Sequence, residues 1–355
     1  MEEGEEKEKG KVGSKEEHHD VVIVGGGICG LATALALHRI EVSHDLLSTT
    51  TDTKRKGINN LVLEKFDTLR ALGAAIGVYI NGWHALDQLG VGMELRRKAI
   101  PLTESYFANY IQDTRYVAPQ EQDANNFMQV LIGCDGSNSV VAKSLGLQAP
   151  KIFPISVVRG FTSYSDGHSF DSHFIRLRDS DVQKDPVLIK KVTLEMLKEF
   201  PIEVIEMVKH CDSSSLSLTR IRYRAPWHLF FANFWQGTMT VAGDAMHVMG
   251  PFLGQGGSAG LEDAIVLARC VAQEMPMGPE GATSDREMVK RIGRALSKYV
   301  NERRLRMMRL STQSYLTGSV MTASSWIKKL VCLAILIVFL RGGSLSHSNY
   351  NCGSL

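Results

Sequence analysis

Two glycine-rich segments, far apart in the chain, contain the residue types that bind phosphate groups. The first, Asp20–Gly30, reads DVVIVGGGICG, a β-branched run followed by glycines at GxGxxG spacing. In such a motif Gly25 permits a tight turn, Gly27 lets a diphosphate approach the backbone, and Gly30 lets a helix pack closely on a strand. Free N–H groups and the dipole at the start of the following helix stabilise phosphate charge. The segment therefore predicts a dinucleotide-binding turn.

The second segment, Val241–Ala264, reads VAGDAMHVMGPFLGQGGSAGLEDA. Asp244 ends a short apolar strand, where burying a carboxylate without hydrogen-bond partners is costly, so a ligand-binding role is favoured. His247 is interpreted as a structural histidine rather than a catalytic base. Either segment alone is a weak signal, but the pair indicates one fold that holds a long, phosphate-bearing cofactor, of which FAD is the best match.

The elements around the first segment follow the order of a dinucleotide-binding fold. Val21–Val24 predicts a buried parallel strand and Ile28–Arg39 a helix rich in alanine and leucine. A second strand ends at Glu64, whose carboxylate suits ribose hydroxyls, but such a residue is expected about 20 positions after the glycines. The polar stretch 40–55 accounts for the delay, and we interpret it as an inserted surface loop or a retained unspliced segment.

Further elements are expected later in the chain. The predicted helices are 79–89, 140–145, 187–207 and 260–273, with one or two more over 284–316; the predicted strands are 130–139 with its terminal turn, 156–161, 173–177 and 238–242. The arginine-rich face of the last helical region is interpreted as solvated and not as a binding patch.

The composition sets bounds on size and partners. A chain of 355 residues with 44% hydrophobic content can bury a large core and suggests about two domains. A formal net charge of +2 gives no global field that would attract nucleic acid. The six cysteines form no CxxC pair and no cluster with histidine, which argues against a metal site or a disulfide framework and favours a reducing compartment.

The two ends of the chain differ from the rest. Residues 1–19 alternate glutamate and lysine with glycine, so we expect a disordered tail without the features of a signal or transit peptide, and a cytoplasmic location by default. Leu330–Leu340 is an apolar run between basic residues, shorter than the roughly 20 residues that span a bilayer. A buried helix is favoured there, and weak contact with a membrane surface stays open.

Three segments taken together, GGGICG, CDGSNS and GDAMHVMGPFLGQGGSAGLEDA, resemble the FAD-dependent aromatic hydroxylases related to p-hydroxybenzoate hydroxylase. Within that family, the resemblance is closest to plant monooxygenases that are similar to salicylate and urate hydroxylases and to zeaxanthin epoxidase. It covers residues 20–39, 57–97 and 130–273, and its most specific part is the Gly-Asp segment with its Pro-x-x-Gly-Gln-Gly extension.

The implied fold class is α/β, with a discontinuous Rossmann-like FAD-binding domain, an interleaved and shortened antiparallel-sheet substrate domain, and C-terminal helices. The implied boundaries are a tail at 1–19, FAD-binding parts at 20–98 (with the insert 40–55), 128–150 and 236–275, substrate segments at 99–127 (truncated) and 151–235, and C-terminal helices with an apolar tail at 284–355.

The resemblance also implies that FAD is held by residues from several separate segments. In chain order these are Gly25, Gly27, Gly30, Glu64, Arg70, Asp135, Gly136, Gly243, Asp244, Pro251, Gly254, Gln255, Gly256 and Gly257. Arg70 is expected near a phosphate or the flavin, Asp135 where FAD and a nicotinamide nucleotide both approach, and Asp244 at a ribityl hydroxyl. The loop 251–257 is expected to bring N–H groups against the flavin ring. No residue is assigned as catalytic.

The implied reaction needs no protein nucleophile. NADPH or NADH reduces the flavin, O₂ adds to give a flavin hydroperoxide, and one oxygen atom hydroxylates or epoxidises a small aromatic or conjugated substrate in a dry pocket. However, residues 100–126 are too few and too polar to form the pocket floor, and a strand-rich stretch around 175–186 is missing. The alternative is therefore an FAD-binding but catalytically impaired truncated isoform. An NAD-dependent dehydrogenase would leave the Gly243-Asp244 segment unexplained.

Overall fold

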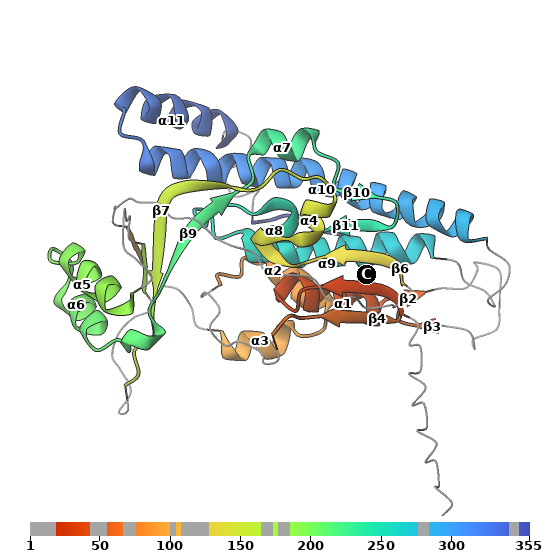
Figure 1. Cartoon of the computed structure of the whole chain (residues 1–355), viewed down its shortest axis with the longest axis horizontal. Coiled ribbons are helices and arrows are strands. Elements are labelled where there is room, and N and C mark those ends of the chain that lie inside the picture. The colour runs from red at the N-terminus through yellow and green to blue at the C-terminus, as the bar shows by residue number, and fades with distance from the viewer. Residues whose placement is uncertain are drawn as a thin grey trace, which may run out of the picture.

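The computed structural model is shown in Figure 1. It describes residues 19–42, 55–66, 76–99, 104–107, 128–164, 173–176, 185–275, 284–340 and 348–355. Residues 1–18, which contain most of the expected tail, and Arg70 lie outside these stretches. All six cysteines are free thiols.

A five-stranded sheet forms the centre of the molecule, in the order β10-β11-β6-β1-β4. Neighbouring strands run parallel except the β10–β11 pair. Val21, Ile23, Val130 and Ile132 are fully buried, as expected for strands covered on both faces. The sheet confirms the predicted Rossmann-like α/β class. Its strands are β1 (His19–Val24), β4 (Asn60–Leu63), β6 (Met128–Gly133), β10 (Trp235–Gln236) and β11 (Met239–Val241).

The N-terminal boundary differs slightly from the prediction. His19 was expected in the disordered tail, but it is the first residue of β1 and pairs with Met128 of β6. The backbone of His19 therefore already belongs to the sheet, because β6 extends far enough to give it a partner.

Three long helices pack together beside the sheet. α1 (Ile28–Arg39) begins and ends where the sequence predicts. α9 (Gly256–Glu274) starts earlier than predicted, inside the glycine-rich motif, and packs against α1, α10 and α2 (Ile80–Gln88). α10 (Asp285–Thr322) is a single helix of 38 residues. Shorter helices include α3 (Gly92–Lys98), α4 (Val140–Ser144) and α8 (Asp244–His247), of which α4 and α8 lie near the site.

Two further strand pairs lie in the segments expected to form a substrate domain. β7 (Lys151–Arg159) and β9 (Ser217–Tyr223) pair antiparallel, whereas β5 (Glu104–Phe107) and β8 (His173–Arg176) pair parallel. Two of these strands, β5 and β9, were not predicted. The single helix predicted over 187–207 is wrong. It is divided into α5 (Pro186–Met196) and α6 (Ile202–Lys209), because Pro201 lacks the N–H that would continue a helix and instead precedes the new one.

Residues 40–55, interpreted as an insertion, begin and end beside each other in the structure, and the insertion itself stays a prediction. β2 (Glu41–Val42) pairs antiparallel with β3 (Arg55–Lys56). The Gly57 N–H donates to the Ile40 carbonyl at 3.3 Å, with Gly57 at a φ of +78°. The chain therefore returns to the point where it left, directly before the turn into β4. Residues 43–54 lie outside the described residues.

Two helices near the C-terminal half of the chain pack on α10: α7 (Pro226–Phe231) and α11 (Trp326–Leu340). The prediction that Leu330–Leu340 forms a buried helix is wrong, because most described side chains of α11 are exposed and only Cys332 is buried. No helix of the described residues has both the length and the apolar character needed to span a bilayer.

Candidate cofactor site

The carboxyl ends of β1, β4 and β6 meet at one edge of the sheet. Gly25 follows β1 with a φ of +108°, and a Cβ atom there would lie 2.5 Å from the Cys134 carbonyl oxygen after β6. The Gly26 N–H donates to Glu64 Oε2, after β4, at 2.8 Å. The first glycine turn is thus packed directly against two of the other predicted cofactor segments.

The N-terminus of α1 is open where a phosphate would approach. Gly27 precedes the helix without a side-chain cap, and a Cβ atom on it would meet no described heavy atom within 4 Å. Gly30 is different, because a Cβ atom there would overlap the Gly25 carbonyl oxygen. Gly30 is therefore required by the close packing of helix and turn, whereas Gly27 keeps the backbone N–H groups accessible.

Asp135 lies beside this turn with one oxygen engaged and one free. Its Oδ2 accepts hydrogen bonds from the Val140 N–H at 2.6 Å and the Val141 N–H at 3.4 Å, which fixes the start of α4. Its Oδ1 is buried without a partner among the described residues. Gly136 has a φ of +79° and open space where a side chain would be. The orphaned oxygen is suited to accept a hydrogen bond from a ligand.

The second glycine segment contacts the first. Gly243 has a φ of +60°, and a Cβ atom there would lie 2.9 Å from Cys29 Cβ in the first turn of α1. The Gly243 N–H donates to Asp263 Oδ2 of α9 at 2.8 Å. Segments more than two hundred positions apart in the chain therefore share one site.

The position of Asp244 differs from the expectation that its carboxylate is buried at the end of a strand. Its side chain is exposed rather than buried in the strand end, and no hydrogen bond to another described residue is recorded for it. The protein atoms around it reduce its hydration and raise the pKa of its carboxyl, with His247 opposing the shift and Asp263 adding to it. The carboxylate lies close to the start of α9, because Oδ1 is 4.0 Å from where a Gly256 Cβ would be.

The loop before α9 has the features predicted for a flavin contact. Pro251 is exposed, and Gly254 has a φ of +64° with Tyr79 packed where its Cβ would be. The N–H groups in the first turn of any helix have no acceptor within the helix. α9 begins at Gly256 without a side-chain cap, so the N–H groups of its first turn, including that of Gly257, are not capped by the Gln255 side chain either. Gln255 is buried, and its Oε1 accepts from Asn81 Nδ2 at 3.0 Å while its Nε2 has no partner among the described residues.

A buried charge network behind the loop was not predicted from the sequence. Arg303 of α10 is fully buried and donates to Asp263 Oδ1 at 2.7 Å and to Glu262 Oε2 at 2.6 Å. Asp263 also accepts from His247 Nε2 at 2.6 Å. Burial alone would raise the pKa of Asp263, but His247 and Arg303 outweigh it and hold that pKa well below its usual range. The interpretation of the α10 arginines as solvated is therefore wrong for Arg303 and for Arg306, which donates to Glu262 Oε1 at 2.9 Å. The burial of His247 in this network agrees with its interpretation as a structural histidine.

Arg224 is a second residue that the sequence did not single out. It follows β9 and is buried, donating to the Gln148 carbonyl at 2.6 Å and to the Ala245 carbonyl of α8 at 3.1 Å. Burial lowers the pKa of its guanidinium to about 10, so it keeps its charge at neutral pH. Arg224 thereby ties the second strand pair to the Gly-Asp turn. A buried arginine between two short elements carries no periodic signal, which is why the sequence did not reveal it.

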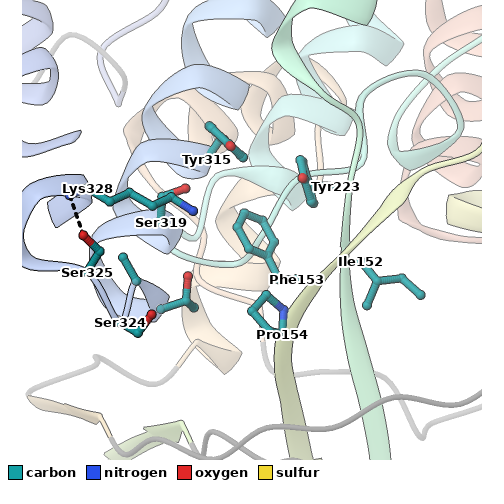
Figure 2. A pocket seen from close by; sticks show the side chains of 11 residues that line it. Ile152, Phe153, Pro154, Tyr223, Tyr315, Ser319, Ser324, Ser325 and Lys328 are labelled. Carbon is teal, nitrogen blue, oxygen red and sulfur yellow. Dashed lines mark hydrogen bonds between the residues drawn. The ribbon is translucent and has the colours of Figure 1, made fainter. Parts of the chain in front are cut away.

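A small cavity of about 210 Å³ lies between the β7–β9 pair and the end of α10 (Figure 2). Phe153, Tyr223 and Tyr315 line it, with rings stacked at centroid distances of 4.2–6.0 Å. Phe252 of the loop before α9 contacts Phe153 edge-on at 5.1 Å. Burial raises the pKa of the Tyr223 hydroxyl, with Tyr315 adding to the shift. The aromatic cluster therefore connects the predicted flavin loop to the strand pair.

These residues fit a dinucleotide cofactor. Helix α1 offers an open, uncapped N-terminus for a diphosphate, Glu64 and Asp244 offer carboxylates for hydroxyl groups, and Asp135 has an oxygen without a partner. Among the described residues, no group of three or more histidine, cysteine, aspartate and glutamate side chains could hold a metal ion.

Comparison with known proteins identifies the group to which this architecture belongs. A family model described as an FAD binding domain matches residues 127–282. Arabidopsis thaliana Monooxygenase 1 is 36% identical over 410 residues, covering 94% of this chain and 99% of the relative. Klebsiella oxytoca 3-hydroxybenzoate 6-hydroxylase is 23% identical, covering 71% and 79%. The crystal structure of Klebsiella pneumoniae HpxO complexed with FAD and uric acid has a TM-score of 0.62 at 17% identity, covering 94% of this chain and 98% of that chain.

The alignment with Arabidopsis Monooxygenase 1 spans 410 positions, more than the 355 residues of this chain, so dozens of residues of the relative have no counterpart here. This agrees with the expected shortening of the chain. The glycine turns, the Gly-Asp segment and the family match point to the same cofactor. The chain belongs to the FAD-dependent monooxygenases of the aromatic-hydroxylase type.

Proposed function

We propose that this monooxygenase uses NADPH or NADH together with O₂ to transfer one oxygen atom to a small aromatic or conjugated substrate. The observation that carries the proposal is the convergence of the glycine turn, Glu64, Asp135 and the Gly243-Asp244 turn at one edge of the sheet. Support for an aromatic substrate comes from two relatives, one a 3-hydroxybenzoate 6-hydroxylase and the other a protein crystallised with uric acid.

The chain's own residues would hold the cofactor in the following way. The N–H groups at the start of α1 would bind the diphosphate beside Gly27, and Glu64 would accept from ribose hydroxyls with the oxygen that does not bind the Gly26 N–H. Asp244 would accept from a ribityl hydroxyl. The uncapped first turn of α9 would direct N–H groups at the ring edge, where they stabilise negative charge. Bound FAD supplies the electron-transfer and oxygen-activation chemistry.

The aromatic cluster is the best candidate for one wall of the substrate pocket. Phe252 belongs to the same loop as Gly254, and it contacts Phe153 of the cavity wall. Tyr223 has a raised pKa, so its hydroxyl stays protonated at neutral pH and can donate a hydrogen bond to an oxygen-bearing ring. Phe153 and Tyr315 present aromatic rings on the same wall, whereas the side toward the end of α10 is lined by hydroxyl groups of Ser319 and Thr322.

Purified protein reconstituted with FAD tests the proposal directly. We expect a flavin absorbance spectrum that bleaches with NADPH or NADH under anaerobic conditions. In air, one member of a panel of phenolic acids should accelerate nicotinamide oxidation and appear as a product heavier by one oxygen atom. Flavin binding without stimulated oxidation or an oxygenated product across the panel would support the catalytically impaired alternative, which the comparisons do not favour.

The pocket wall has a separate test. Tyr223→Phe removes the hydroxyl but keeps the ring, so FAD binding should be unchanged while the apparent affinity for a stimulating phenolic acid falls by roughly threefold to tenfold, the effect of one lost hydrogen bond. Phe161→Leu, at an exposed position outside the cavity lining, is the control and should leave that affinity unchanged.

A further inference from the structure

Helix α11 exposes an unusual amount of apolar surface. The exposed side chains include Trp326 (69%), Val338 (68%), Ile327 (57%) and Leu330 (54%). Among the described side chains of α11, 326–338, only Cys332 is buried and Leu336 half-buried, one helical turn apart, so a narrow stripe of these side chains faces the rest of the protein. An exposed apolar patch of this kind marks a surface that binds a partner or a membrane.

Helix α7 extends the same apolar surface. Phe231 is 80% exposed and Phe230 48% exposed, although the helix itself is firmly attached. Arg304 of α10 donates to the carbonyls of Leu229, Phe230 and Ala232, which fixes the C-terminal end of α7. In Figure 1, α7 and α11 both lie at the upper edge of the molecule, and both pack on α10 beneath them.

The charged side chains of α11 have one sign. The helix contains two lysines and no acidic residue. Lys328 and Lys329 lie in the first turn of α11 and are exposed. A protein partner of ordinary composition does not require such a bias, whereas a surface of acidic phospholipids does.

The length of α11 decides how it would meet a bilayer. Its 15 residues extend about 22 Å at 1.5 Å per residue, less than the roughly 30 Å of a bilayer's hydrocarbon core. The helix is therefore suited to lie in the interface, with its apolar side chains among the acyl chains and the lysines at the headgroups.

We propose that α11 and the exposed phenylalanines of α7 form a docking surface for an acidic phospholipid bilayer, on which the monooxygenase lies without crossing it. Tryptophan at one end of α11 fits the headgroup level, where its ring and N–H find apolar and polar surroundings together. The inference uses no residue of the cofactor site, although Lys328 also borders the aromatic cavity.

Sedimentation with vesicles tests this surface in the full-length, FAD-loaded protein. The wild type should bind vesicles of phosphatidylcholine mixed with phosphatidylserine, and bind pure phosphatidylcholine more weakly. Val338→Glu should reduce binding to the mixed vesicles by at least about tenfold, because it places a charge among the acyl chains. Met93→Glu is the matched control, since Met93 on α3 is 70% exposed, close to Val338 at 68%, and α3 lies at the opposite edge in Figure 1.

Charge reversal separates the electrostatic attraction to acidic lipids from the apolar attraction to the acyl chains. Lys328→Glu with Lys329→Glu should weaken binding to the acidic vesicles by about tenfold or more and leave the weaker binding to phosphatidylcholine nearly unchanged. Lys191→Glu with Lys198→Glu, at exposed lysines in and after α5, should bind as the wild type does.

Two results would overturn the proposal. One is a wild type that sediments with neither kind of vesicle. The other is a wild-type dimer in light scattering that Val338→Glu converts to a monomer, because the surface would then be covered by a second copy of the chain. The retained flavin absorbance of each variant shows that a loss of vesicle binding does not come from unfolding.

Discussion

At the scale of single residues, two glycines of the first turn have different roles, which the sequence motif alone does not distinguish. Gly30 is needed because any side chain would overlap the Gly25 carbonyl, whereas Gly27 has nothing within 4 Å and is needed only if a ligand approaches. The distinction separates a requirement of the fold from a requirement of binding.

Alanine substitution at these two positions should therefore give opposite results. Gly27→Ala should leave the unfolding free energy of the FAD-free protein within about 1 kcal/mol of the wild type, because its φ of −76° is ordinary for alanine. Its affinity for FAD should fall by roughly tenfold or more, since a methyl group would displace the diphosphate from the backbone. Gly30→Ala should lower the unfolding free energy by several kcal/mol. Chemical denaturation and fluorescence titration measure the two quantities, and equal FAD affinity in Gly27→Ala and the wild type would contradict the assignment.

Asp244 gives the site a dependence on pH. Its raised pKa means that the carboxyl takes up a proton at a higher pH than the value of about 3.9 of a free aspartate. The ionised form accepts the stronger hydrogen bond, so FAD affinity should fall as the pH decreases through that raised pKa. Asp244→Asn cannot ionise, and should bind FAD roughly fivefold more weakly at neutral pH with no change across this acid range.

Release of flavin fluorescence during acid titration measures this effect. Asp87→Asn is the control, because Asp87 is exposed and paired with Arg96, away from the cofactor site. A wild type and an Asp244→Asn variant with parallel pH profiles would remove Asp244 from the cofactor site.

At the scale of elements, the sequence predicted the cofactor half well because its signals are local. A β-branched run with glycines after it predicts β1 and its turn, and the alanine-rich stretch gives both ends of α1. The exposed α11 and the divided helix at Pro201 were missed for different reasons. An apolar run indicates a helix but not what covers it, and Pro201 competes with an otherwise amphipathic pattern.

The side-chain pairs between distant segments also could not be predicted from the sequence. Nothing in the order of residues indicates that Arg303, near the middle of a 38-residue helix, meets Glu262 and Asp263 of α9. These three side chains join α9 to α10 and hold the Gly243 turn through Asp263. The residues that bind the cofactor follow a motif, whereas the residues that position the motif depend on the fold.

Arg303→Ala should consequently cost about 3 kcal/mol of unfolding free energy, because it removes the fully buried cation that Glu262 and Asp263 share and leaves them only Arg306 and His247. Arg294→Ala, on the same helix, is the control: Arg294 is half exposed and pairs with Glu274 at the surface, so its loss should cost less than about 1 kcal/mol. Urea denaturation of the FAD-free proteins compares them. Similar losses for the two variants would show that the buried network does not stabilise the α9–α10 contact.

At the scale of the whole molecule, the cofactor site is built from segments that the chain places far apart. The turns after β1, β4, β6 and β11 come from four regions of sequence and meet only in the folded state. A ligand that binds all four stabilises the folded chain and not the unfolded one. Bound FAD is thus expected to stabilise the folded central sheet, in addition to its chemical role.

FAD should therefore raise the melting temperature of the protein, and the gain should depend on both halves of the cofactor. At a concentration of about 100 times its Kd, FAD contributes about 2.7 kcal/mol, or a shift of roughly 3–4 °C for a chain of this length. FMN carries the flavin without the adenylate, so it can engage the Gly243–Gly257 segment but not Glu64, and should give a smaller shift. Differential scanning calorimetry with each ligand and with the Gly27→Ala variant checks this. Equal shifts from FMN and FAD would mean that Glu64, after β4, takes no part in binding, because only the adenosine half of FAD can reach it.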